Sequence, residues 1–232
     1  LDEAHTCATF FVLGWIAERH PDLVREITRR GHEIASHGYM HQRVYTQTPE
    51  KFREETRLSK KILEDMIGTP VSGYRAASYS ITLKSLWALD ILIEEGFLYD
   101  SSIFPVVHDR YGIPNGERFS HVIKRPAGTI LEHPLSTLRF GKVNVPFGGG
   151  GYLRLFPYSL TKWAIKRLNR VERQPAIVYL HPWEVDPAQP RINGSLLSNF
   201  RHYVNLGKTE QTLKNLLSDF QFVPMKDLMR DL

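Results

Sequence analysis

Short apolar runs alternate with helical stretches along the chain, and this alternation constrains the fold more than any other feature of the sequence. The runs are rich in β-branched and aromatic side chains, which is typical of buried strands. We expect strands at residues 7–13, 32–36, 71–74, 97–99, 129–133, 176–180 and 222–224. Because strands joined through helices usually lie parallel in one sheet, residues 1–232 are predicted to form a single α/β domain.

Helical periodicity separates these runs, and most helical stretches end at a glycine or a proline. The clearest helix begins at Pro49, a first position where proline is favoured, with Thr48 as its N-cap, and it ends at Gly68. Further helices are expected at residues 21–30, 83–95, 158–169 and 209–220. Residues 101–125, rich in Pro, Gly and His, and the four glycines at 148–151 are expected to be loops.

Ionisable or metal-binding residues directly follow several of the predicted strands. They are His37, His41, Arg75, Asp100 and His181. In parallel α/β folds the catalytic side chains gather at the carboxyl ends of the strands, where core packing alone would favour apolar residues. These positions therefore predict an active site at that edge of the sheet.

His37 and His41 have the i, i+4 spacing that lets two imidazoles bind one Zn²⁺ on the same face of a helical turn. A pair of surface histidines with the same spacing is the alternative. The position directly after a strand, in a loop that begins Ser36-His37-Gly38, favours the metal site. Imidazole ligands favour zinc, nickel, cobalt or iron over magnesium or calcium.

The other three residues each have a catalytic and a structural interpretation. His181 suits a general acid because histidine titrates near neutral pH, with Asp100 as the carboxylate that holds its proton in place. Alternatively, His181 is a core histidine bonded to a backbone carbonyl, and Asp100 caps the turn that follows it. Arg75 could orient a carboxylate through a bidentate pair or close a structural salt bridge.

Two aromatic residues are candidates for contact with a sugar. Tyr152 and Trp183 could stack on sugar faces, although lining the core is the default role of such side chains. The glycines at 148–151 are followed by Tyr-Leu-Arg rather than by Lys-Ser or Lys-Thr, which excludes a nucleotide-phosphate loop.

Composition and charge exclude several classes of protein. The formal net charge of +5 comes from Lys and Arg residues mixed with Glu along helical stretches, so solvated helix faces explain it better than a nucleic-acid site. No apolar run is long enough to span a membrane. The single cysteine, Cys7, cannot form an internal disulfide and is compatible with a reducing compartment, so a cytoplasmic location is favoured over a periplasmic one.

Several motifs occur in the order found in one family. They are TFFVLG (Thr9–Gly14), GHEIASHGYMH (Gly31–His41), GYRA (Gly73–Ala76), GFLYDSS (Gly96–Ser102) and YLHPWE (Tyr179–Glu184). Together they resemble the NodB-homology polysaccharide deacetylases. A bacterial branch, encoded in exopolysaccharide loci linked to PEP-CTERM sorting, is similar also in HDRYGIP (His108–Pro114), HPLST (His133–Thr137) and FRHYVNL (Phe200–Leu206).

The resemblance implies a distorted (β/α) barrel with fewer than eight strands and a divalent metal, usually Zn²⁺, with Ni²⁺ or Co²⁺ as other options. An Asp would hold the metal together with His37 and His41, and a second Asp, oriented by Arg75, would act as the base. His181 would protonate the departing amine, and Asp100 would tune it. The implied reaction removes N-acetyl groups from amino sugars of a bacterial exopolysaccharide, and the implied partner is an N-acetylated polysaccharide or oligosaccharide.

The chain departs from the family pattern in two places. Ala77 replaces the proline that normally continues the arginine motif, which leaves open whether the backbone N–H of Ser78 or of Tyr79 points inward; Tyr79 is also a candidate substrate contact. The acidic strand that supplies the base and the third metal ligand would precede residue 1, so the first β/α unit is expected to be missing. With two ligands in place of three, we expect weak metal binding and near-background deacetylation.

Two other functions are compatible with these motifs. One is a small-molecule hydrolase of cyclic amides, and the other is a catalytically silent carbohydrate-binding protein. Metal analysis would separate the enzymes from the silent protein, and product analysis would separate the deacetylase from the amidase.

Overall fold

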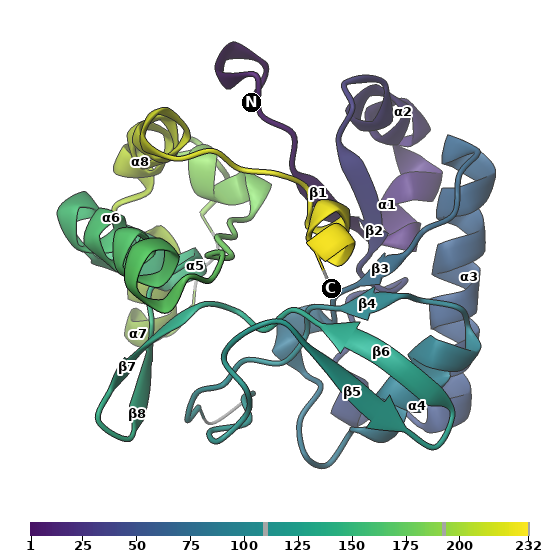
Figure 1. Ribbon diagram of the computed structural model, residues 1–232. Helices are drawn as coiled ribbons and strands as arrows, with labels where there is room; N and C mark the ends of the chain where they lie inside the picture. Colours follow the sequence, from purple (N-terminus) through teal and green to yellow (C-terminus); the bar gives the residue numbers. More distant parts are fainter. Residues whose placement is uncertain (109–110, 192–193, 232) are drawn as a thin grey trace. The chain divides into compact units, whose positions relative to one another are not determined.

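The computed structural model describes residues 1–108, 111–191 and 194–231 (Figure 1). Asp109 and Arg110, in the HDRYGIP motif, lie outside the described residues. The described residues form two compact units. Residues 1–134 and the end of the chain from Phe222 make up the first unit, and residues 135–221 make up the second. This division does not decide whether residues 1–232 are a single domain, so that prediction stays open.

A sheet with the strand order β1-β2-β3-β4-β6-β5 forms the centre of the first unit. Its strands are β1 (Thr9–Val12), β2 (Glu33–Ser36), β3 (Gly73–Tyr74), β4 (Tyr99–Asp100), β5 (His121–Arg125) and β6 (Gly128–Glu132). All run parallel except β5, which pairs antiparallel with β6. The α/β class is therefore confirmed, and so is a main sheet of fewer than eight strands; within the described residues this sheet is open from β1 to β5.

Helices connect the parallel strands of the first unit. They are α1 (Gly14–Arg19), α2 (Pro21–Arg29), α3 (Pro49–Ile67) and α4 (Trp87–Glu94), with short 3₁₀ helices at Asp2–Ala4, Val44–Thr46, Ala77–Tyr79 and Met225–Asp231. The prediction for α3 is confirmed, because the Thr48 hydroxyl accepts a hydrogen bond from Lys51 N–H at 3.3 Å and Gly68 ends the helix with φ 72°. Figure 1 shows α1 to α4 beside the sheet.

The core of the first unit lies between these helices and the sheet. Contacts of α2 and α3 with β2, and of α4 with β6, bury the apolar face of each helix. The buried side chains include Ile34, Phe52, Leu63, Leu89 and Leu92. This packing holds the strand ends in fixed register, which is what places the polar residues that follow them.

The second unit is mainly helical. It contains the hairpin β7 (Thr137–Phe140) and β8 (Val143–Pro146), then α5 (Gly150–Leu155), α6 (Tyr158–Arg167), a π-helical turn at Leu168–Glu172, a 3₁₀ helix at Pro182–Val185, α7 (Leu196–Tyr203) and α8 (Leu206–Asp219). The core of this unit includes the buried side chains of Ile165 on α6, Leu168 at the start of the π-helical turn and Leu216 on α8. Across both units, no described helix combines the length and the apolar character needed to cross a membrane.

The strand predicted at residues 176–180 is wrong. This segment makes a single parallel bridge, between Gly149 and Tyr179, and its side chains are half-buried. At Gly149 a β-carbon would lie 2.2 Å from the Tyr179 ring, so the two segments approach this closely only because Gly149 has no side chain. An apolar run becomes a strand only where another strand pairs with it, and the run itself does not show that partner.

Other segments also differ from the predictions. Residues 222–224 form no strand and lead into the last 3₁₀ helix, while two of the glycines at 148–151 begin α5. The region 101–125, predicted to be irregular, contains β5. Only Pro126 and Ala127 separate β5 from β6, and Gly128 follows with φ 138°, so a tight hairpin turn creates β5.

Candidate active site

The carboxyl ends of four neighbouring strands meet at one edge of the first unit's sheet. The register pairs Ser36 with Tyr74, Tyr74 with Asp100, and Asp100 with Glu132. The residues predicted from the ends of β2, β3 and β4 therefore do gather at this edge. His37 and Arg75 each follow directly after their strand, while Asp100 is the last residue of β4.

His37 and His41 lie close together, with ring centres 5.0 Å apart and planes inclined at 66°. His37 Nδ1–H donates to the backbone carbonyl of Arg75 at 2.7 Å. Since a carbonyl oxygen only accepts, this bond places the proton on Nδ1 and the imidazole lone pair on Nε2. Histidines that bind metals commonly donate their second ring N–H in this way.

The spacing of the two rings fits a shared metal ion. Two imidazoles bound to one tetrahedral ion at about 2.0–2.1 Å have ring centres roughly 5 Å apart. Among the described residues, no third His, Cys, Asp or Glu side chain completes a metal-binding group with this pair. His37 and His41 could therefore supply two ligands of a metal site.

Arg75 is buried at the same edge. Its Nε donates to the Ser101 carbonyl at 3.0 Å, and Nη2 donates to the Ser101 hydroxyl at 2.7 Å. The guanidinium also lies 4.1 Å from the centre of the Phe11 ring. These contacts fix the guanidinium plane, whereas the role of orienting a catalytic carboxylate stays a prediction.

Asp100 and Glu132 form a pair of fully buried carboxyl groups. Asp100 accepts from the Ser102 hydroxyl, and Glu132 Oε1 accepts from the Ile103 N–H at 2.9 Å. Burial raises the pKa of Asp100 to about 6, and burial together with the neighbouring Asp100 charge raises the pKa of Glu132 well above its ordinary value. Glu132 was missed at the sequence level, although it occurs near the end of an apolar run, as Asp100 does.

Tyr79 lies in a strained 3₁₀ turn, Ala77–Tyr79, that follows β3. Ser78 and Tyr79 both have left-handed backbones, with φ 53° and 52°, an arrangement that concentrates at functional sites. The Tyr79 N–H donates to the Ala76 carbonyl at 3.1 Å, which favours Ser78 as the donor that points inward. The Tyr79 ring is half-buried and packs edge-on against Phe104 and Tyr111.

In the second unit, His181 has a carboxylate partner of its own. Its Nδ1 bonds to Glu184 Oε1 at 2.8 Å, and Arg154 Nε donates to Glu184 Oε2 at 2.7 Å. The interpretation of His181 as a core histidine bonded to a carbonyl is wrong, because 47% of its side chain is exposed. The pairing of His181 Nδ1 with Asp100 is corrected as well, since Glu184, three residues along the chain, occupies that position.

The two candidate sugar-stacking residues are both half-buried. The Trp183 ring is stacked on the His202 ring at 4.1 Å and near-parallel to the His181 ring at 5.5 Å. Tyr152, on α5, has Phe156 as a ring neighbour at 6.3 Å. Their contact with a sugar stays a prediction.

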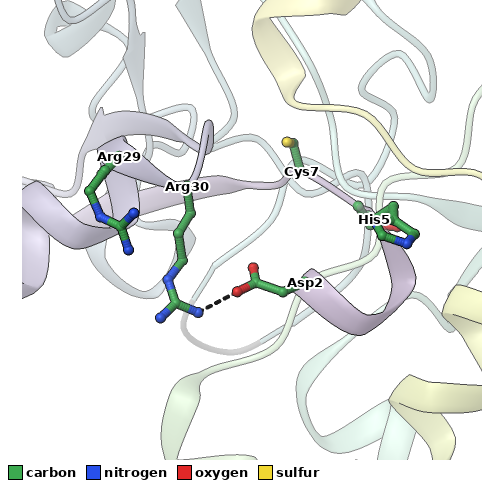
Figure 2. A pocket seen from close by; sticks show the side chains of 6 residues that line it. Asp2, His5, Cys7, Arg29 and Arg30 are labelled. Atoms are coloured by element: carbon green, nitrogen blue, oxygen red, sulfur yellow. Dashed lines mark hydrogen bonds and ion pairs between the residues drawn. The ribbon is translucent and has the colours of Figure 1, made fainter.

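A cavity of about 500 Å³ lies elsewhere in the first unit (Figure 2). Its lining residues are Asp2, His5, Thr6, Cys7, Arg29 and Arg30. Figure 2 shows the Arg30 guanidinium joined to the Asp2 carboxylate by an ion pair. These residues precede β1 and β2, at the end of the sheet opposite to His37 and Arg75, so the cavity is separate from the candidate site.

Comparison with known families accounts for most of the chain. Residues 101–230, more than half of its length, match a domain of unknown function, DUF3473. The chain belongs to the DUF3473 family. Residues 1–90 match the polysaccharide deacetylase family, in agreement with the NodB-homology resemblance of the motifs.

Individual relatives are described as deacetylases of peptidoglycan. The chain is 26% identical over 118 residues to a peptidoglycan deacetylase of Helicobacter pylori, covering 51% of this chain and 39% of that protein. It is 33% identical over 64 residues to a peptidoglycan-N-acetylglucosamine deacetylase of Bacillus cereus, covering 28% and 30%. The chain thus matches well under two thirds of the length of these relatives.

The fold is shared with a solved structure described as a polysaccharide deacetylase from Mycobacterium smegmatis. The TM-score is 0.65 at 22% identity, over 100% of this chain and 73% of that one. The boundary between the two family matches, near residues 90–101, falls inside the first unit. The DUF3473 segment therefore completes the sheet with β5 and β6, and it also contributes His181, Glu184 and Arg154.

Proposed function

We propose that this protein is a metal-dependent hydrolase that removes N-acetyl groups from amino sugars, with a bacterial exopolysaccharide as its substrate. The observation that carries the proposal is the His37–His41 pair, spaced for one ion and oriented by the Arg75 carbonyl, within the segment that matches polysaccharide deacetylases. The ion would be zinc, with nickel or cobalt as substitutes.

When bound, a divalent metal at this site would polarise the acetyl carbonyl and lower the pKa of a coordinated water. His37 and His41 would hold it, and donors other than the described His, Cys, Asp and Glu side chains would complete its coordination. The proposal therefore predicts a metal site that is open to water, as catalytic zinc sites are.

The remaining residues have roles in binding and in proton transfer. We assign His181 as the group that protonates the departing amine, because its half-exposed ring carries a carboxylate on Nδ1 and can deliver a proton from Nε2. The Ser78 N–H is assigned to the developing oxyanion. Arg75 fixes the segment after β4 through Ser101 and carries a positive charge at the site.

The choice of an exopolysaccharide rests on the motifs shared with the PEP-CTERM-linked branch. The relatives from H. pylori and B. cereus are described as acting on peptidoglycan. The purified chain, with and without an acidic strand added before residue 1, should therefore be tested on N-acetylated exopolysaccharide, chito-oligosaccharide and peptidoglycan side by side, with released acetate as the measured product. A preference for peptidoglycan would keep the reaction and overturn the substrate.

The metal site gives a first test of the proposal. His37→Ala and His41→Ala should lose bound zinc in elemental analysis while keeping the circular dichroism of the parent. His20→Ala removes an exposed histidine outside the site and serves as the matched control. If either site variant retains as much zinc as the parent, the ligands are misassigned. Glycan binding without acetate release would indicate a silent carbohydrate-binding protein instead.

A further inference from the structure

We propose that Glu184 and Arg154 are positioning residues that hold His181 in one tautomer, and that this is a task of the DUF3473 segment. The catalytic value of that tautomer rests on the proposed function, in which His181 donates a proton. The positioning itself is a property of the second unit and can be measured without any turnover.

Glu184 accepts two hydrogen bonds from His181. Its Oε1 accepts from the ring Nδ1–H at 2.8 Å and from the His181 backbone N–H at 2.9 Å. Pro182 begins the 3₁₀ turn that contains Glu184 and has His181 as its N-cap, and the proline ring restricts the backbone between them. Because the same Glu184 oxygen accepts from both the imidazole ring and the backbone N–H of His181, rotation of the imidazole would break a hydrogen bond.

Arg154 fixes the other oxygen of Glu184. Its Nε donates to Oε2, and the two side chains are 3% and 0% exposed. The remaining guanidinium N–H groups donate at 2.6–3.1 Å to the backbone carbonyls of Arg201, His202 and Val204. These carbonyls lie at the end of α7, where a helix leaves its acceptors without intrahelical partners. Arg154 thereby joins α5, the end of α7 and Glu184 in one rigid arrangement.

Only an ionised carboxylate satisfies these donors. Burial raises the pKa of Glu184, but the hydrogen bonds from the His181 ring and backbone N–H, together with the Arg154 charge, outweigh burial, so the net pKa is lowered. Glutamine offers one oxygen and one NH₂ group. Whichever way its amide is turned, an N–H would face either Arg154 Nε–H or the His181 backbone N–H.

The consequence for His181 is a defined tautomer. A carboxylate accepts and cannot donate, so Nδ1 carries the proton in the neutral ring and Nε2 carries the lone pair. Nε2 is then the atom that gains and releases the proton of the proposed reaction. The Trp183 ring, near-parallel to His181, limits tilting of the imidazole plane.

The tautomer can be read by nitrogen NMR on the 232-residue chain labelled with ¹⁵N-histidine. Loss of signals in His181→Ala identifies the His181 resonances. We expect the neutral ring to be protonated at Nδ1 in the parent and to shift towards the Nε2–H form in Glu184→Gln. Glu210→Gln, which removes an exposed carboxylate paired with Lys214, is the matched control and should change nothing.

Either of two results would overturn the positioning role. One is a parent His181 protonated at Nε2, which needs no variant to fold. The other is a folded Glu184→Gln chain with an unchanged tautomer. In active protein, Glu184→Gln should lower kcat roughly 10²-fold with little change in KM. The expected tautomer without acetate release, even when an acidic strand is added before residue 1, would contradict the proposed function and leave the positioning intact.

Discussion

Buried carboxyl groups in the two units have pKa values shifted in opposite directions, although all of them are fully enclosed. Asp100 and Glu132, in the first unit, have raised pKa values, whereas Glu184, in the second, has a lowered one. All three are 0% exposed. Burial alone therefore does not decide whether these groups are charged.

The number of hydrogen-bond donors explains the difference. Asp100 Oδ2 and Glu132 Oε2 find no N–H or O–H donor among the described residues, so they can bond to each other only if one carboxyl keeps its proton. The two oxygens of Glu184 accept from the His181 ring, the His181 backbone and Arg154. Asp100 and Glu132 in the first unit thus share a proton, whereas Glu184 in the second unit keeps its negative charge.

The largest expected effect concerns the residue that the fixed charge orients. His181→Ala should lower kcat for acetate release by roughly 10²–10⁴-fold, the usual contribution of general acid–base catalysis. The ring is half-exposed, so the melting temperature and zinc content should barely change. A large loss of stability with normal turnover in the folded fraction would show that His181 is structural.

Removing the Glu184 carboxylate should lower the free energy of unfolding. Glu184→Ala leaves the buried Arg154 guanidinium without its carboxylate, and breaking one side of a buried ion pair costs about 3–5 kcal/mol. Urea unfolding followed by circular dichroism would measure it. Glu210→Ala, which breaks the more exposed pair with Lys214, should cost about 1 kcal/mol or less and provides the comparison. Equal losses in the two variants would contradict the difference in burial.

The shared proton should make stability depend on pH. Folded Asp100 keeps its proton up to about pH 6, but the unfolded chain releases it near 3.8, so the folded state binds more protons between these values. The free energy of unfolding contributed by Asp100 is therefore fully present below about pH 4 and declines as pH rises to 6, by on the order of 3 kcal/mol. Asp100→Asn should flatten this decline in unfolding curves measured at several pH values.

The smallest effect is expected for glutamine in the shared-proton pair. In Glu132→Gln the amide can donate to Asp100 as the protonated carboxyl does, while its oxygen still accepts from Ile103 N–H. At neutral pH the free energy of unfolding should change by about 1 kcal/mol or less. The same substitution at Glu184 should cost clearly more. A comparable loss of unfolding free energy in both variants would contradict the difference between the two units.

Some features of this protein could be predicted from the sequence because they depend on residues close together in the chain. Thr48, Pro49 and Gly68 define α3 because a cap, a first-turn proline and a left-handed terminal glycine act within a few residues. His37, Arg75 and Asp100 were found because a parallel sheet brings strand ends to one edge. The alternation of strands and helices likewise predicted the α/β class.

Tertiary structure decided the features that depend on residues far apart in the chain. Arg154 and Glu184 are thirty positions apart, and nothing in either motif indicates the ion pair between them. The failed strand at 176–180 lacked a neighbouring strand, a condition outside its own residues. The sequence by itself determined the polar groups at the ends of β2, β3 and β4 and the beginning of α3. Only the folded chain decided which groups are charged, because a carboxyl's protonation depends on the donors that packing brings to it.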